Sequence, residues 1–203
     1  MKTVTIVAKG PTAVNANDWC KPGRTSMVSI NDSYKLFDRK PNYSFISDMG
    51  ALDSNMGPER ISRLFHPAFS SDVSITDGRQ PPLWYTELLN NGKVVTYPDR
   101  YCPGGCEDFD KRIAEGGICH HSTVAGAMHY VVKVLKYEKV RLIGVDGGTE
   151  FAPGVGPVTE VTARILARHN GKRDYMTLWK KVFKNLAIVL HNHYGTVFEW
   201  YGE

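Results

Sequence analysis

A short polar turn, Lys9-Gly10-Pro11-Thr12, follows the first apolar run of the chain at residues 4–8. Because glycine has no side chain to obstruct an approach, the backbone N–H groups of such a turn can contact a phosphate. The turn has neither the Gly-x-Gly-x-x-Gly pattern of dinucleotide sites nor a Walker lysine after its glycine. We therefore expect Gly10, Pro11 and Thr12 either to hold a phosphate or to form a tight structural turn.

Polar side chains also follow later apolar runs that are typical of strands. Asn31-Asp32, Asp48 and Asp146 each come at or just after the end of such a run. In open sheets of parallel strands, ligands bind at the carboxyl ends of the strands, where amides and carboxylates can take ribose hydroxyls or base edges. Asn and Asp also cap turns in ordinary loops, which is the alternative for each of them. We favour a nucleotide site at these strand ends.

Glycines and hydroxyl side chains lead into the clearest predicted helix of the chain. Gly116-Gly117 comes shortly before Ser122-Thr123, where the helix is expected to start. The N-terminus of a helix offers unpaired N–H groups and partial positive charge to an anion. Gly117, Ser122 and Thr123 are thus candidates for nucleotide binding, although simple N-capping explains Ser122 equally well.

Thiols and imidazoles lie close together in the sequence at Cys102, Cys106, Cys119 and His120. These are the ligand types that zinc prefers, and four of them can close a tetrahedral site. Their spacing departs from the usual Cys-x2-Cys pattern, and free thiols of a reducing compartment are the alternative.

The runs of sequence that must position these residues are short and mostly apolar, without alternation of polar and apolar residues. Such runs are typical of strands that are covered on both faces in a parallel sheet. A helix is predicted after His121, capped by Ser122 and ending near Tyr137, because apolar residues recur there at spacings of three or four. A second is predicted over residues 174–186. The predicted strands are residues 4–8, 27–30, 43–46, 94–97, 140–145 and 196–200.

The order of these elements predicts an α/β fold with a Rossmann-like, mostly parallel sheet flanked by helices. The 203 residues are expected to form one domain. Between about residues 51 and 117, Gly, Pro and Asp punctuate short segments, so we expect an irregular insertion or lid there.

Composition and charge point to an ordinary globular protein, with 42% hydrophobic residues and a formal net charge of +4. A mildly basic chain favours phosphate-bearing partners without requiring nucleic acid. Basic residues gather over residues 164–184, as a phosphate-facing patch or as a solvated helix face. The N-terminal apolar run is too short for a signal peptide or a membrane span, so we expect a cytoplasmic protein, and the sequence allows a homo-oligomer.

Three motifs, taken in order, resemble those of one group of proteins. Ala8-Lys9-Gly10-Pro11-Thr12, His121-Ser122-Thr123 and Gly144-Val145-Asp146 stand where family 42 sialyltransferases have a Gly-x-Gly-Pro-Ser turn, a Thr-Ser-Gly helix start and a Gly-Ile-Asp strand end. The chain is therefore similar to the Rossmann-like superfamily of these sialyltransferases and of the 6-hydroxymethylpterin pyrophosphokinase-like proteins. The resemblance covers roughly residues 4–48 and 116–146.

This resemblance implies a glycosyltransferase-like enzyme that uses a nucleotide-activated sugar donor, with inversion and without a metal or other cofactor. It implies that the turn at Gly10 holds the phosphates, that Asn31 and Asp48 hold the nucleotide, and that Ser122 or Thr123 lies over the donor. The acceptor is not indicated.

Inversion needs a base near the acceptor hydroxyl, and the pKa of histidine suits that task. His169 lies about where the sialyltransferases place their catalytic histidine, and His120 and His121 compete because they adjoin the donor site. The sequence departs from the family at Thr123, where glycine is expected, and it has no evident tyrosine pair for the phosphate, although Tyr97 and Tyr101 are available.

Two other functions compete with this one. A Mg²⁺-dependent diphosphate transfer from ATP, as in the pterin pyrophosphokinase branch, needs converging carboxylates, which Asp48, Asp53 and Asp146 can supply. A non-catalytic module that binds nucleotides or nucleic acid would instead use aromatic residues such as Trp84 and Tyr85 for stacking.

Overall fold

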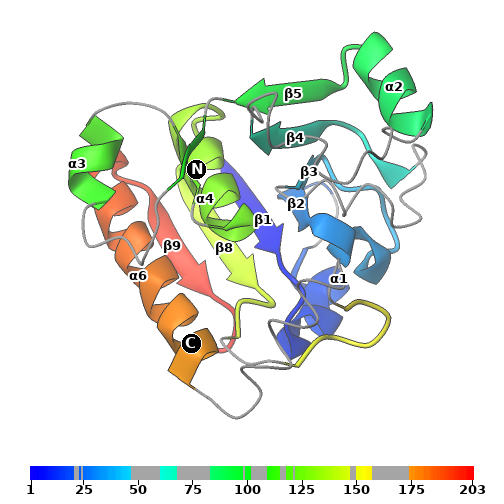
Figure 1. Cartoon of the computed structure of the whole chain (residues 1–203). Helices are drawn as coiled ribbons and strands as arrows, with labels where there is room; N and C mark the ends of the chain where they lie inside the picture. Colours follow the sequence, from blue (N-terminus) through cyan, green and yellow to red (C-terminus); the bar gives the residue numbers. More distant parts are fainter. Residues whose placement is uncertain are drawn as a thin grey trace.

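Seven strands form one sheet in the computed structural model of the chain, in the order β5-β4-β3-β2-β1-β8-β9 (Figure 1). Every neighbouring pair is parallel, which confirms the predicted α/β fold. The strands are β1 (Thr3–Val7), β2 (Ser26–Ile30), β3 (Tyr43–Phe45), β4 (Leu64–Pro67), β5 (Val94–Tyr97), β8 (Lys139–Ile143) and β9 (Val197–Trp200). The structure describes residues 1–20, 23, 25–46, 60–67, 83–97, 99–101, 109–114, 118–120, 122–146, 150–156 and 174–203.

Helices cover both faces of this sheet. On one face lie α4 (Thr123–Lys133) and α6 (Asp174–Tyr194), as Figure 1 shows. The other face is covered by η1 (Pro11–Asn15), α1 (Ala16–Trp19), η2 (Asn31–Leu36) and α2 (Leu83–Asn90). The short helix α3 (Phe109–Ala114) contacts α6 and β7 (Ile118–His120), and β7 forms a separate parallel pair with β6 (Asp99–Tyr101).

This double coverage explains why the strands are apolar without alternation. Along β1, Val4 and Ile6 are fully buried toward α4 and α6, whereas Val7 is fully buried in the cluster on the other face. A strand buried on both sides has no solvent-exposed position, and even Thr5 of β1 is fully buried.

The central helix α4 begins as predicted. The hydroxyl oxygen of Ser122 accepts a hydrogen bond from the backbone N–H of Ala125 at 3.2 Å, which satisfies one of the free donors of the helix start. The helix ends at Lys133, earlier than predicted, and the following turn carries Lys136 at a φ of 57°.

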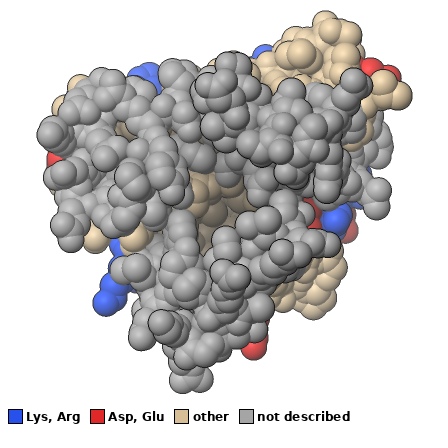
Figure 2. All heavy atoms as spheres, viewed as in Figure 1, with Lys and Arg blue, Asp and Glu red and all other residues tan. Residues whose placement is uncertain are grey.

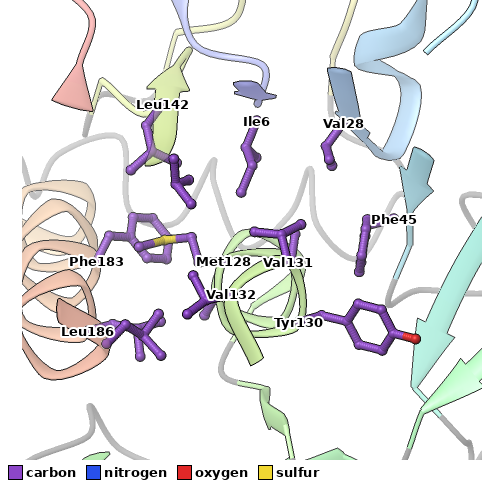
Figure 3. Close-up of a cluster of buried hydrophobic side chains, with 14 of the residues drawn as sticks. Ile6, Val28, Phe45, Met128, Tyr130, Val131, Val132, Leu142, Phe183 and Leu186 are labelled. Atoms are coloured by element: carbon purple, nitrogen blue, oxygen red, sulfur yellow. The ribbon is translucent and has the colours of Figure 1, made fainter. Parts of the chain in front are cut away.

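The core between the sheet and the two long helices is shown in Figure 3. Val131 of α4 faces Ile6 and Val28 of the sheet, and Phe183 of α6 reaches toward Met128. The helix α6 runs past its predicted end at residue 186 to Tyr194, since buried side chains at Ala187 and Leu190 continue its apolar stripe.

The irregular insertion expected at residues 51–117 is corrected in part. Within it, β4 and β5 pair in register with the main sheet, and α2 lies between them in the sequence. The segment therefore extends the sheet on the β3 side. A strand as short as Leu64–Pro67, interrupted by His66, gives little apolar signal, which is why the sequence alone missed it.

The strand order reverses at the centre of the sheet. From β1 the chain moves outward through β2, β3, β4 and β5, and it returns to the other side of β1 with β8 and β9. In open α/β sheets the crevice at such a switch point, beyond the carboxyl ends of the strands, is where ligands bind. This places the point of greatest interest just after β1 and β8.

None of the helices in the described part of the chain is both long and apolar enough to cross a membrane.

Candidate functional site

The loops after β1 and β8 are joined directly at the switch point. The backbone N–H of Ala8 donates to the carbonyl of Ile143 at 2.9 Å, and that of Gly10 donates to the carbonyl of Gly144 at 2.8 Å. The two strand ends thereby continue as a pair for a few residues beyond the sheet. The turn that begins at Gly10 is fixed against the end of β8.

A carboxylate from one loop clamps the other loop. Oδ2 of Asp146 accepts the backbone N–H of Thr12 at 2.9 Å, and Oδ1 accepts the Thr12 hydroxyl at 2.5 Å. The same hydroxyl oxygen accepts the N–H of Gly144 at 3.0 Å. Asp146 and Thr12, both predicted to contact a nucleotide, therefore bind each other and set the shape of the turn.

Two glycines make this close approach possible. A Cβ on Gly10 would collide with Oδ2 of Asp146 and would lie 2.7 Å from the carbonyl oxygen of Gly144. Gly144 has a φ of 74°, and a Cβ there would lie 2.9 Å from the carbonyl oxygen of Ala8. Both glycines are thus required by contacts within the protein.

The backbone donors of the Gly10 turn are already in use. The N–H of Gly10 goes to Gly144, that of Thr12 goes to Asp146, and that of Ala13 goes back to the carbonyl of Gly10 at 2.9 Å. Pro11 has no N–H. A phosphate bound by these amides, as the sequence suggested, would have to displace one of these partners.

A buried lysine stands beside the turn. Nζ of Lys9 lies 2.9 Å from Oδ1 of Asp32, whose other oxygen is 3.6 Å from Nζ of Lys35. The Lys9 ammonium also donates to the carbonyl of Gly156, and the backbone carbonyl of Lys9 accepts the N–H of Ala152 at 2.8 Å. Lys9 therefore joins the loops that follow β1, β2 and β8.

Burial lowers the pKa of Lys9 below the ordinary value of 10.5, while the hydrogen bond and the charge of Asp32 oppose this change. Only 12% of the Lys9 side chain is exposed. Asp32, predicted as a ligand contact, is the counter-ion of this lysine.

Asn31 is a strand-end residue whose side chain keeps a hydrogen-bond acceptor unused by the other described residues. It follows β2 directly and holds a φ of 52°, in the left-handed region that costs energy for residues other than glycine. Its amide oxygen Oδ1 is buried and has no hydrogen-bond partner within the described residues. Ser33 fixes the loop from below, since its hydroxyl donates to the carbonyl of Val7 at 2.7 Å.

The predicted helix start lies toward the same edge of the sheet. The N–H of Glu138 donates to the carbonyl of Lys2, so α4 ends near the start of β1. Its first residues, Ser122 and Thr123, must therefore point toward the carboxyl ends of the strands. Ser122 is occupied as a cap, and Thr123 is buried.

Several predicted site residues lie outside the described part of the chain. They are His121, His169, Asp48, Asp53, Gly117, Cys102 and Cys106. Cys119 and His120 belong to the backbone of β7, but their side chains are not among those described. Among the described residues, no three His, Cys, Asp or Glu side chains come together as a metal site.

Two residues at the carboxyl ends of strands, Lys9 and His66, are not among the site residues predicted from the sequence. A lysine at the end of a buried strand nevertheless needs a counter-ion, and this is a usable signal in the sequence. His66 is buried at the end of β4 with Nε2 2.8 Å from the hydroxyl of Tyr85, whose pKa is raised by burial. By contrast, His129 is a core residue of α4, and burial lowers its pKa to about 4.

The basic stretch expected to form a phosphate-facing patch is partly neutralised. Lys180 and Lys184 of α6 pair with the two carboxylate oxygens of Glu203, at 2.7 and 2.8 Å. On the face shown in Figure 2, the described Lys and Arg side chains appear at separate places around the rim. These observations favour the solvated helix face for the described part of that stretch.

Comparison with known proteins gives structural but no sequence relatives. No family model matches the sequence, and no curated protein matches it. Sialyltransferase CstII from Campylobacter jejuni, in complex with the substrate analogue CMP-3FNeuAc, is similar in structure, with a TM-score of 0.52 and 12% identity over 98% of this chain and 81% of that one.

Two further structures of that protein are also similar. The complex with a trisaccharide acceptor and CMP has a TM-score of 0.56 and 14% identity, over 98% of this chain and 80% of that one. A point mutant of the alpha-2,3/8-sialyltransferase CstII has a TM-score of 0.51 and 13% identity, over 98% of this chain and 81% of that one. At such identities the similarity establishes a shared fold.

Proposed function

We propose that the chain is a glycosyltransferase-like enzyme that takes a sugar from a nucleotide-activated donor, and that the nucleotide is CMP. The observation that carries the proposal is Asn31, held in a left-handed conformation with a buried amide oxygen that no described residue contacts. The shared fold supports it, because CstII binds CMP and the analogue CMP-3FNeuAc.

The chemistry of Asn31 suits a nucleoside. A buried polar atom without a partner costs about 1–3 kcal/mol, and a strained backbone adds to this cost. An N–H of a base or an O–H of a ribose would supply the missing donor. The position of Asn31 at the carboxyl end of β2, next to the switch point, is where such ligands bind in this class of fold.

The rest of the site supplies rigidity. The two hydrogen bonds between Asp146 and Thr12 hold the turn after β1 in one conformation before any donor is bound. A pre-formed site loses less conformational entropy on binding.

The proposed reaction is a single displacement with inversion. The acceptor hydroxyl attacks the anomeric carbon, its proton passes to a histidine, and the bond from that carbon to the phosphate oxygen breaks with the electron pair leaving on CMP. His169 and His121 are the proposed bases. Replacing each by alanine in turn should lower kcat for transfer by at least about a hundredfold for the true base and leave CMP binding unchanged.

We propose that the reaction needs no metal. Asp146 has both oxygens engaged by Thr12, so it offers little to a cation in this arrangement. The sequence Asp108-Phe109-Asp110 has the Asp-x-Asp form used by metal-dependent transferases, but Oδ1 of Asp110 lies 3.0 Å from Nε2 of His193. The Mg²⁺-dependent pyrophosphokinase alternative, which counted on Asp146, is correspondingly less favoured.

A thermal-shift screen tests the proposal, because a ligand that binds the native state raises Tm. The panel is CMP, UMP, UDP, GDP, ATP and the matching nucleotide-sugars, each with and without Mg²⁺. We expect a Mg²⁺-independent shift with CMP and a CMP-sugar, lost in Asn31→Ala and kept in the exposed control Asn91→Ala. A shift with ATP that requires Mg²⁺ would support the pyrophosphokinase alternative instead, and binding without release of CMP from a CMP-sugar would indicate a non-catalytic module.

A further inference from the structure

We propose that Lys9 is the group that contacts the phosphate of the bound nucleotide, an inference that rests on the function proposed above. The geometry carries it in three steps: the amides of the neighbouring turn are occupied, the ammonium of Lys9 keeps one unused donor, and its counter-ion is shared with a second lysine.

The first step concerns what else could hold an anion at the switch point. The N–H groups of Gly10, Thr12 and Ala13 all have acceptors within the protein, and Pro11 has none to give. The turn therefore presents a shaped surface without free backbone donors. A phosphate placed there needs a donor from a side chain.

The second step counts the donors of Lys9. An ammonium group has three N–H donors. One goes to the carbonyl of Gly156, and the ion pair with Oδ1 of Asp32, at 2.9 Å, takes up a second. No acceptor for the third is present among the described residues, and the ring of Phe151, centred 5.2 Å from Nζ, covers the ammonium without accepting a conventional hydrogen bond.

The third step concerns charge. Asp32 is the one described carboxylate in contact with Lys9, and it also pairs with Lys35, so two cations share one anion. The other carboxylate of the site, Asp146, is held by Thr12. The cluster of Lys9, Asp32 and Lys35 keeps one net positive charge, with Lys9 and Asp32 buried and Lys35 exposed, and a phosphate there would restore balance.

Burial also lowers the pKa of Lys9, because the protein interior stabilises the ammonium less well than water does. A phosphate oxygen in contact with Nζ would provide that stabilisation. The position of Lys9 between the loops after β1, β2 and β8 lets this one contact hold all three loops around the nucleotide.

The test compares CMP with cytidine, which lacks the phosphate, in the full chain. Affinities are measured by titration calorimetry for CMP and by saturation-transfer NMR for cytidine. We expect Lys9→Met to weaken CMP binding by about 10- to 100-fold and to change cytidine binding by less than about twofold, as expected for the loss of a charge-assisted hydrogen bond. The exposed Lys40→Met removes the same charge elsewhere and should leave both affinities unchanged.

Loss of Lys9 alone leaves Asp32 partly unpaired, so the double variant Lys9→Met/Asp32→Asn is measured in parallel and should show the same selective loss of CMP. Unchanged CMP affinity in both variants would overturn the role of Lys9 while leaving the proposed function intact. An equal loss of CMP and cytidine would overturn it as well, because Lys9 would then act on the shape of the pocket. Binding of neither compound by the unaltered protein would overturn the proposed function itself.

Discussion

Removal of the Asp146 carboxylate should release the turn at the switch point and destabilise the whole domain. Asp146→Ala removes two hydrogen bonds, from the N–H and from the hydroxyl of Thr12, at 2.9 and 2.5 Å. Hydrogen bonds to charged groups contribute about 1.5–3 kcal/mol each when well shielded, and this pair is only partly buried. We therefore expect the free energy of unfolding to fall by about 2–4 kcal/mol.

The pairing itself is isolated by a double-mutant cycle. Thr12→Val removes the hydroxyl, which also accepts the N–H of Gly144 at 3.0 Å, and should cost about 1–2 kcal/mol. Because the two side chains share one hydrogen bond, the double variant should be more stable than the sum of the single losses predicts, by about 1–2 kcal/mol.

The assay is urea unfolding followed by circular dichroism, at fixed pH and ionic strength. Asp38→Ala, at an exposed position, serves as the control and should stay within about 0.5 kcal/mol of the parent protein. If the losses in free energy of unfolding for Asp146→Ala and Thr12→Val add up exactly in the double variant, the pairing of the two side chains is refuted. A loss in Asp146→Ala no larger than that of the control would refute it as well.

Three further predictions concern other parts of the chain. His129 is buried, and its pKa is lowered from 6.5 to about 4. Between these two pH values the side chain is neutral in the folded protein but takes up a proton on unfolding. The free energy of unfolding should therefore fall by up to about 3 kcal/mol as the pH drops from about 6.5 to 4. In His129→Phe this part of the pH dependence of urea unfolding should disappear, and an unchanged dependence would contradict the assignment. Gly144→Ala should cost about 2–5 kcal/mol, since its Cβ meets backbone at 2.9 Å, whereas Gly92→Ala, at a φ of 64° in open space, should cost only about 1–2. Ser122→Ala should lower the free energy of unfolding by about 1 kcal/mol through loss of the α4 cap, which thermal unfolding can check. An unchanged Tm would contradict this prediction.

The sequence was sufficient to predict the elements that bury continuous apolar runs. Apolar runs predict β1, β2 and β8 to within one or two residues, and the residue type alone predicts the Ser122 cap. These features depend on local patterns, which are readable without knowing the fold. The missed strand β4 has His66 and Pro67 among its four residues, so its identity depends on pairing with β3 and β5.

The sequence predicts where in the sheet the candidate site lies, but not which side chains are in contact there. Gly10, Thr12, Asn31 and Asp146 were assigned to one edge of the sheet, and the structure brings them there. The sequence does not show which of these side chains form hydrogen bonds with one another. The pairing of Asp146 with Thr12 spans 134 residues of chain, and no local pattern encodes a partner at that separation.

That separation also governs when the site can form. β1 lies at the centre of the sheet, yet one of its two neighbours, β8, is synthesised long after it. Closing a loop of that length is entropically slow, and contacts of this kind tend to be late in folding. During synthesis, the edge of β1 that pairs with β8 stays unpaired until β8 has been made. We therefore expect a chain interrupted before residue 139 to have an unpaired central strand and to be prone to aggregation. The edge of the sheet that carries Gly10 and Asp146 therefore cannot assemble from a fragment that lacks β8, however well that fragment collapses.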